Sequence, residues 1–190
     1  MLNLLRAYIA VFDRLNDWLS RGLAVMVWFV AGICAAVVVL RYGFHISFTW
    51  MQELYVWVHA VVFLGAASYA MMINSHVRVD IVNSNWSVRT RAVVEIIGTL
   101  IFTLPWVVIL AWFTWPFIVD SWSIREGSSQ SNGMPGVYLL RTALLGFSAL
   151  MTVQCLSLIA RCILALSGDK DIQNSPPFAR TSSVLDDVSS

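Results

Sequence analysis

The chain has 190 residues, of which 58% are hydrophobic and only 12% are charged. A soluble domain of this length is about half apolar and about one quarter charged, so this composition predicts a protein of the lipid bilayer. The mean hydropathy of +0.73 agrees with that interpretation. A net charge of +1 provides no strongly basic face and argues against a nucleic-acid-binding protein.

Residues 1–21 carry apolar side chains at helical spacing, with charged residues on the other faces. The apolar set consists of Leu2, Leu5, Ile9, Phe12, Leu15, Trp18 and Leu19. This pattern predicts a short amphipathic helix that lies in the inner membrane interface. The same pattern leaves open the alternative that these residues extend the first membrane helix.

Four long apolar runs follow, at about residues 22–40, 54–73, 92–119 and 142–160. A helix needs about 20 mostly apolar residues to cross a bilayer, and barrel strands would instead alternate apolar and polar residues. We therefore expect an all-α integral membrane protein whose residues 22–166 form a domain of four transmembrane helices. Pro105 is a candidate for a kink in the third helix, because membrane helices tolerate proline.

The positions of Lys and Arg predict the orientation. Nine of the twelve flank one side of the four runs, and Arg41, Arg125 and Arg141 flank the other side. The positive-inside rule therefore puts both termini and the connection at 74–91 in the cytoplasm. Residues 167–190 contain Pro, Ser and charged residues with few large apolar ones, which predicts a disordered cytoplasmic tail.

Three chemically capable residues, His76, Arg78 and Asp80, come directly after the second run. On a continuing helix His76 and Asp80 would be neighbours, and Arg78 would point elsewhere. No Cys or second His lies close by to complete a metal site, and no nucleophile completes a catalytic triad. We expect no catalytic residue, metal or cofactor here, but a membrane border that contacts lipid or a partner protein.

The centres of the predicted helices hold no charged residue, which is unlike the core of a transporter. His59 is the only histidine deep within a run, so this chain alone offers no pair of histidines for a haem. The three cysteines, Cys34, Cys155 and Cys162, lie in or beside apolar runs and are expected to be buried. Small residues at spacing four favour close helix packing, either within the chain or against another membrane protein.

Residues 41–82, "RYGFHISFTWMQELYVWVHAVVFLGAASYAMMINSHVRVDIV", resemble the small membrane subunit of TRAP transporters, the DctQ-like family. The resemblance rests on the order of several short features. These are Arg41 with Tyr42, Trp50, Glu53, the patch at 64–67 that contains Gly65, the set His76, Arg78 and Asp80, and the later Glu126 and Ser128 with Pro135. The chain departs from the family at Gln52, where a second acidic residue is frequent, and at Arg141, near which the usual Trp and Pro are missing.

This resemblance implies a small scaffold subunit of a tripartite, sodium-coupled, binding-protein-dependent transporter that imports organic acids. It implies no enzymatic activity, a place in the bacterial or archaeal cytoplasmic membrane, and two partners. These partners are a large elevator-type membrane subunit and a periplasmic substrate-binding protein. The residues that it marks for structural or partner contacts are Arg41, Trp50, Glu53, Gly65, His76, Arg78, Asp80 and Glu126.

Within that set we expect Arg41 and Glu53 to fix the turn between the first two helices or to pair with the large subunit. We expect His76, Arg78 and Asp80 at the cytoplasmic border between subunits. Three alternatives stay open on the sequence: a membrane anchor of a redox complex, a small homodimeric exporter, and a membrane assembly factor.

Overall fold

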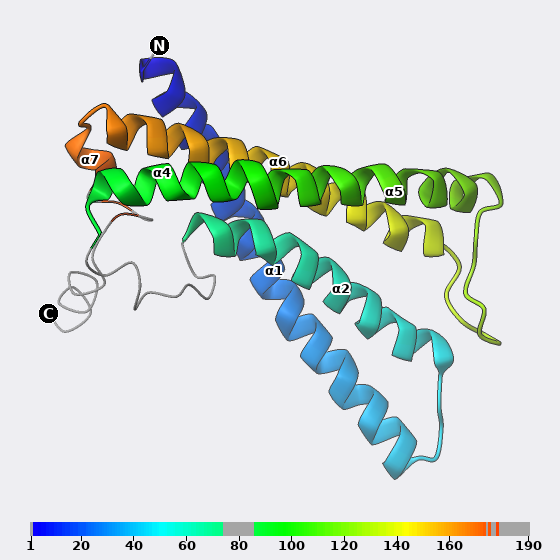
Figure 1. Cartoon of the computed structure of the whole chain (residues 1–190). Helices are drawn as coiled ribbons and strands as arrows, with labels where there is room; N and C mark the ends of the chain where they lie inside the picture. The colour runs from blue at the N-terminus through cyan, green and yellow to red at the C-terminus, as the bar shows by residue number, and fades with distance from the viewer. Residues whose placement is uncertain (1, 74–85, 174, 176–177, 179–190) are drawn as a thin grey trace, which may run out of the picture.

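The computed structural model describes residues 2–73, 86–173, 175 and 178, and this part of the chain is helical (Figure 1). Its helices are α1 (Leu2–Gly43), α2 (Thr49–Met72), α4 (Val88–Gly98), α5 (Leu104–Ser123), α6 (Val137–Leu166) and the short α7 (Lys170–Gln173). A π-helical turn, η1 (Thr99–Thr103), joins α4 to α5 without a break. The four resulting long helices are each long and apolar enough to cross a membrane, which confirms the expected all-α architecture.

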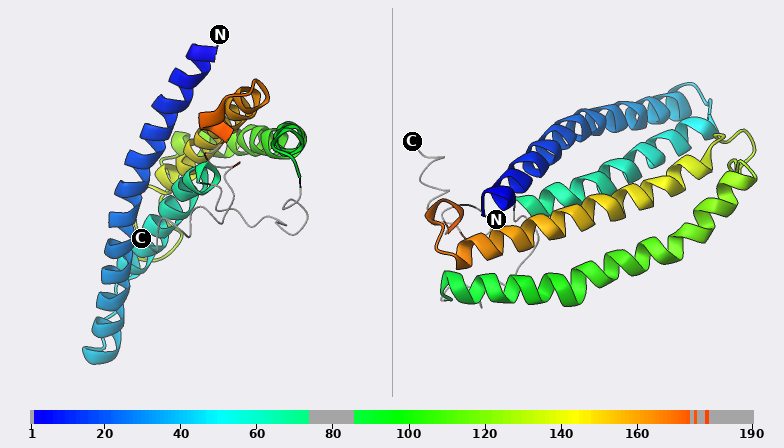
Figure 2. Two further views of the ribbon diagram at one scale, coloured as in Figure 1. Left: turned by 90° about the vertical axis from the view of Figure 1, so that its left-hand side faces the viewer. Right: turned by 90° about the horizontal axis from the view of Figure 1, so that it is seen from above.

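The long helices lie side by side in the order α1, α2, α6 and then α4 with α5, as the right-hand view of Figure 2 shows. The connections at 44–48 and 124–136 both lie at one end of the bundle, which we call the loop end. The start of α1 and the end of α6 lie at the opposite end, which we call the terminal end. Near the terminal end, α1 also crosses α6.

Helix α6 is the centre of the bundle. It alone contributes about half of the buried residues of the described chain, because it packs against α1, α2, α4 and α5. The other three long helices have few buried residues, and each carries large apolar side chains that are exposed, α2 fewer than α1 and α5. Such surfaces are stable only when lipid or another protein covers them.

Residues 2–43 form one continuous helix, so the segment at 2–21 extends the first membrane helix, as the alternative interpretation expected. Its buried residues, Ile9, Asn16 and Leu23, recur every seven positions, which is close to two helical turns. At about 1.5 Å per residue, α1 is roughly 63 Å long, whereas the hydrocarbon core of a bilayer is about 30 Å thick. An upright α1 would therefore reach well beyond the hydrocarbon region.

The third long helix changes its hydrogen-bond pattern immediately before Pro105. Because proline has no N–H, it cannot complete the α-helical ladder, and η1 occupies the preceding turn. The buried residues Ala92 and Thr99 are seven positions apart, whereas Thr99 and Val107 are eight apart. A π-helical turn holds one residue more than an α-turn, so all three residues stay on the face that α6 covers.

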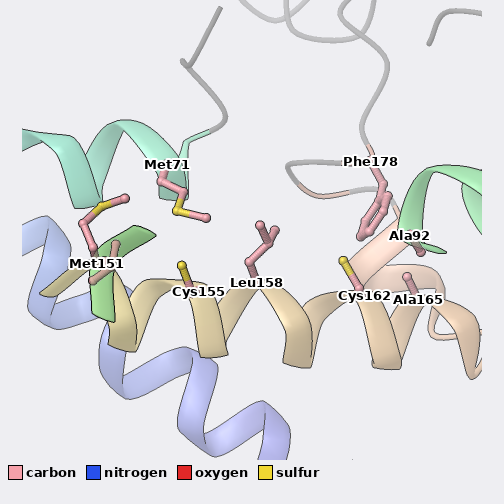
Figure 3. Packing of buried hydrophobic residues seen from close by; sticks show 9 residues of the cluster. Met71, Ala92, Met151, Cys155, Leu158, Cys162, Ala165 and Phe178 are labelled. Carbon is pink, nitrogen blue, oxygen red and sulfur yellow. The ribbon is translucent and has the colours of Figure 1, made fainter. Parts of the chain in front are cut away.

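The hydrophobic core at the terminal end gathers side chains from α2, α4 and α6 (Figure 3). Cys155 and Cys162 are fully buried there, as expected, but the expectation is wrong for Cys34, which is exposed on the uncovered surface of α1. The described residues of the segment predicted to be disordered include the short helix α7 and Phe178, which joins this core at 3% exposure.

Candidate functional site

The connection at residues 124–136 is a folded loop at the loop end. Gly127 and Pro135 form an antiparallel bridge, and the Ser128 N–H donates to the Met134 carbonyl oxygen at 3.1 Å. Inside this hairpin, the Gly133 N–H donates to the Gln130 carbonyl oxygen at 3.1 Å. Backbone hydrogen bonds therefore join the two halves of the loop to each other before α6 begins.

Glu53, one turn into α2, fastens this loop to the neighbouring helix. Its Oε2 accepts a hydrogen bond from the Met134 N–H at 2.6 Å, and its Oε1 accepts one from the Ser128 hydroxyl. A Cβ added at Gly133 would lie 2.8 Å from Glu53 Oε2 and closer still to Ser128 Oγ, so this approach requires glycine. The carboxylate thus receives two hydrogen bonds from a segment about eighty positions further along the chain.

The sequence predicts that Arg41 and Glu53 fix the turn between the first two helices or pair with the large subunit. Among the described residues no ion pair joins these two side chains. The Arg41 guanidinium instead lies 5.8 Å from the centre of the Tyr42 ring, and Arg41 is exposed. The physical reason is that the loop donors reach Glu53 from the side of α5 and α6. Arg41 remains available to lipid or to a partner.

Glu126 performs a second linking role in the same loop. Its Oε1 accepts from Arg141 Nη2 at 2.7 Å, and its Oε2 accepts from the Ser121 hydroxyl at 2.8 Å. The Trp122 indole N–H also donates to Thr142 Oγ1 at 3.0 Å. These contacts join the end of α5 to the first turns of α6. Arg141, a departure from the family pattern, therefore supplies the cation for Glu126.

The remaining sequence-predicted residues serve other purposes or lie outside the described chain. A Cβ at Gly65 would lie 2.8 Å from Leu23 Cδ1, so Gly65 permits the close approach of α1 and α2. Trp50 is 45% exposed, with its ring 6.2 Å from the Phe48 ring. His76, Arg78 and Asp80 lie outside the described residues, so their proposed role at a border stays a prediction.

A buried polar cluster at Asn16, Ser68 and Gln154 is a feature that sequence reasoning missed. The Asn16 side-chain amide donates to Gln154 Oε1 at 2.7 Å, and the Ser68 hydroxyl donates to Asn16 Oδ1 at 3.0 Å. All three side chains are almost fully buried. The cluster ties α1, α2 and α6 together. The available signal was a lone Asn on the apolar face of residues 1–21.

Two ion pairs join α1 to the chain at and after the end of α6. Arg161 Nη2 donates to Asp13 Oδ2, and Arg6 Nε donates to Asp169 Oδ2 at 2.9 Å. Arg161 is only 8% exposed, so its charge is largely withdrawn from water and depends on its partners. Basic residues that the orientation argument counted at the membrane border therefore also hold the terminal end together.

An apolar groove of about 970 Å³ separates parts of α5 and α6. Trp112, Trp115 and Pro116 line one wall, and Ala149 and Thr152 are among the residues of the other. The Thr152 hydroxyl donates to a carbonyl of its own helix at 2.8 Å, so it does not need a partner in the groove. The groove therefore presents an apolar surface.

His59 lies on the exposed surface of α2, between the exposed side chains of Val56 and Phe63. It is therefore not covered by the other helices of this chain, although it lies deep within an apolar run. Among the described residues, no group of three or more His, Cys, Asp or Glu side chains could hold a metal ion.

The fold and these contacts define a helical membrane protein built from four long apolar helices and held by polar contacts at its two ends. The family model for tripartite ATP-independent periplasmic transporters, DctQ component, matches residues 30–165. The chain belongs to the DctQ family, whose members are transporter components and not enzymes. This finding confirms the resemblance seen in the sequence. Comparisons with the curated proteins and with the solved structures found no match.

Proposed function

We propose that this chain is the small scaffold subunit of a tripartite, sodium-coupled, binding-protein-dependent secondary transporter that imports organic acids. The observation that carries the proposal is the DctQ family match over residues 30–165, which includes Glu53, Gly65 and Glu126. The subunit performs no chemistry on the substrate. It widens and anchors the static part of the transporter, in the bacterial or archaeal cytoplasmic membrane.

The partner in the membrane is the large elevator-type subunit that carries substrate and sodium. The uncovered apolar surfaces of α1, α2 and α5 support this pairing, because a single chain leaves them without protein contacts. His59 gives more specific support. An imidazole that faces lipid tails is costly, and ionisable residues at membrane depth usually find a polar partner. A neighbouring protein helix can supply that partner on the exposed side of α2.

The terminal end lies in the cytoplasm and the loop end in the periplasm. The excess of Arg and Lys on the terminal side supports this orientation. In this orientation the loop at 124–136 faces the periplasmic substrate-binding protein, and Glu53 and Glu126 keep its shape constant for docking. His76, Arg78 and Asp80 contact the large subunit at the cytoplasmic border.

The test is a purification of tagged chain from its native membranes in mild detergent, followed by mass spectrometry and an absorption scan. A large polytopic membrane protein in equal amount, with no haem band, is the expected result. Recovery of the chain as a homodimer without a larger partner would instead identify a small exporter. Recovery of a haem-bearing complex would identify a redox anchor.

A second experiment addresses transport itself. The large subunit is reconstituted into liposomes with and without this chain, and the binding protein loaded with an organic acid is added outside. Uptake that requires the chain, the binding protein and an inward sodium gradient is expected. Equal uptake by liposomes that lack this chain would contradict the scaffold role.

A further inference from the structure

Phe178 is buried at the terminal end although it lies beyond the last membrane helix. It is 3% exposed and belongs to the same hydrophobic core as Met71 of α2, Ala92 of α4 and Cys162 of α6. Figure 3 shows its ring beside Ala92 and over the Cys162 sulfur. Fully burying a phenylalanine side chain stabilises a structure by about 1.5–3 kcal/mol, so this contact is a substantial part of a small core.

The residues that lead to Phe178 are held on the bundle at several points. Gln173 Nε2 donates to the Ala165 carbonyl oxygen at 2.8 Å, and the Asp169 carboxylate pairs with Arg6 of α1. Ile172 packs against both hydrophobic cores of the chain. The Phe178 N–H donates to the Ser175 carbonyl oxygen at 2.9 Å.

The Phe178 ring packs onto a site, which we call the seat, that is lined by residues with small side chains. Ala92, Cys162 and Ala165 are each at most 4% exposed, and none is large enough to fill the space between the ends of the three helices. An aromatic ring supplied from outside the helices fills that space. The family match ends at residue 165, so the segment that provides the ring lies outside the part of the chain that the family defines.

We propose that residues 169–173, Ser175 and Phe178 form a strap that closes the terminal end of the bundle, with Phe178 as its anchor. The strap holds the end of α2 and the start of α4 on α6. Without it, the seat opens and the buried thiol of Cys162 becomes accessible. This inference concerns the chain itself and stands independently of the proposed transport function.

The Cys162 thiol is the natural reporter, because Phe178 covers it directly (Figure 3). The full-length chain in its native membranes carries Cys34→Ala and Cys155→Ala, so that Cys162 is the remaining cysteine. A membrane-permeant maleimide is added, and the labelling rate is compared with that of the unfolded chain. Protection in this parent is expected, since Cys162 is fully buried.

In this background, Phe178→Ala and a chain that ends at Gly168 are both expected to label roughly tenfold faster or more, as local opening replaces protection. Phe178→Leu keeps an apolar side chain in the seat and should label at an intermediate rate. The matched control is Phe102→Ala, which removes a ring that is 72% exposed on η1 and should leave the rate unchanged.

A second reporter chain keeps Cys155 and replaces Cys162 by Ala. Cys155 lies two helical turns away, about 10 Å along α6, and should stay protected in Phe178→Ala. Unchanged protection of Cys162 in both Phe178→Ala and the shortened chain would overturn the proposal. Equal exposure of Cys155 and Cys162 would overturn it as well, because the whole bundle would then have opened. Rapid labelling of Cys162 in the parent chain would also overturn the proposal.

Discussion

The Met134 N–H donates a hydrogen bond to Glu53 Oε2 at 2.6 Å, although 81 positions separate the two residues in the sequence. Glu53 belongs to α2, and Met134 belongs to the loop between α5 and α6. One carboxylate thereby links the first turns of α2 to the loop at 124–136. The shape of the loop depends on α2, and any contact that moves α2 at this end acts on the loop.

Replacing Glu53 by Gln should loosen this link. Glutamine has one side-chain oxygen, whereas Glu53 uses both of its oxygens as acceptors. A hydrogen bond to a charged group contributes about 1.5–3 kcal/mol, so we expect Glu53→Gln to lower the free energy of unfolding by about that amount. Thermal unfolding of the purified chain in mild detergent measures the loss, and uptake by the assembled transporter should fall with it.

Asp120→Asn is the control for Glu53→Gln. It removes a carboxylate at the same end of the bundle from an exposed position, without a side-chain hydrogen bond among the described residues. This variant should keep the stability and uptake of the parent. Full uptake by Glu53→Gln membranes would show that the link is not needed for transport.

Gly133→Ala tests the same link from the loop side. The new methyl group would lie 2.8 Å from Glu53 Oε2, so the loop or Glu53 must shift. We expect faster cleavage of the loop by an added protease and a lower unfolding temperature. Gly127→Ala is the matched control, because its Cβ would lie 4.0 Å from the nearest atom, Pro135 Cα. Two variants with equal cleavage rates would contradict the close approach.

Asn16→Ala should destabilise the chain through the polar cluster inside the bundle. It leaves Gln154 Oε1 without its donor, and an unsatisfied buried polar group costs about 1–3 kcal/mol. The Ser68 hydroxyl loses its bond to Asn16 and keeps the Gly65 carbonyl oxygen as an acceptor. Asn3→Ala, at an exposed position of the same helix, is the control and should have little effect. Thermal unfolding in detergent compares the two. A smaller loss in the double variant Asn16→Ala with Gln154→Ala than the sum of the single losses would confirm direct coupling.

His59→Phe separates partner binding from folding. The side chain is exposed, so the isolated chain should unfold at the same temperature as the parent. If a polar group of the large subunit contacts the imidazole, the amount of large subunit that copurifies should fall several-fold. Phe63→Leu, on the same exposed face, controls for a change of apolar shape. An undiminished yield of large subunit with His59→Phe would exclude this contact.

The four long helices could be predicted because each apolar run is long enough on its own to require a membrane. The helix ends were harder to predict, since a helix continues past its apolar core into residues such as Arg141 and Arg161. The continuous α1 illustrates the same limit. Its first half carries charged residues that predict an interfacial segment, but Asp13 pairs with Arg161 and Asn16 with Gln154 inside the bundle.

Glu53 and Glu126 could be selected from the sequence only through the family resemblance. Their partners, Met134 and Arg141, could not be predicted, because those contacts depend on how the loop folds back over α2 and α6. The burial of Phe178 could not be predicted from the sequence either. The few apolar residues of this polar tail form no periodic pattern, and the burial of Phe178 becomes visible only when the ends of three helices come together.

The π-helical turn at Thr99–Thr103 changes the direction in which all later side chains of the helix point. Every residue after it is rotated by about 100° around the helix axis relative to an unbroken α-helix, because the π-helical turn contains one extra residue. Deleting a single residue from this turn would keep the composition of α5 nearly unchanged. It would nevertheless rotate Val107 and Ile118 away from their buried positions and present a different stripe of side chains to α6. The five-residue π-helical turn thus determines which face of the twenty-residue helix α5 is buried against α6.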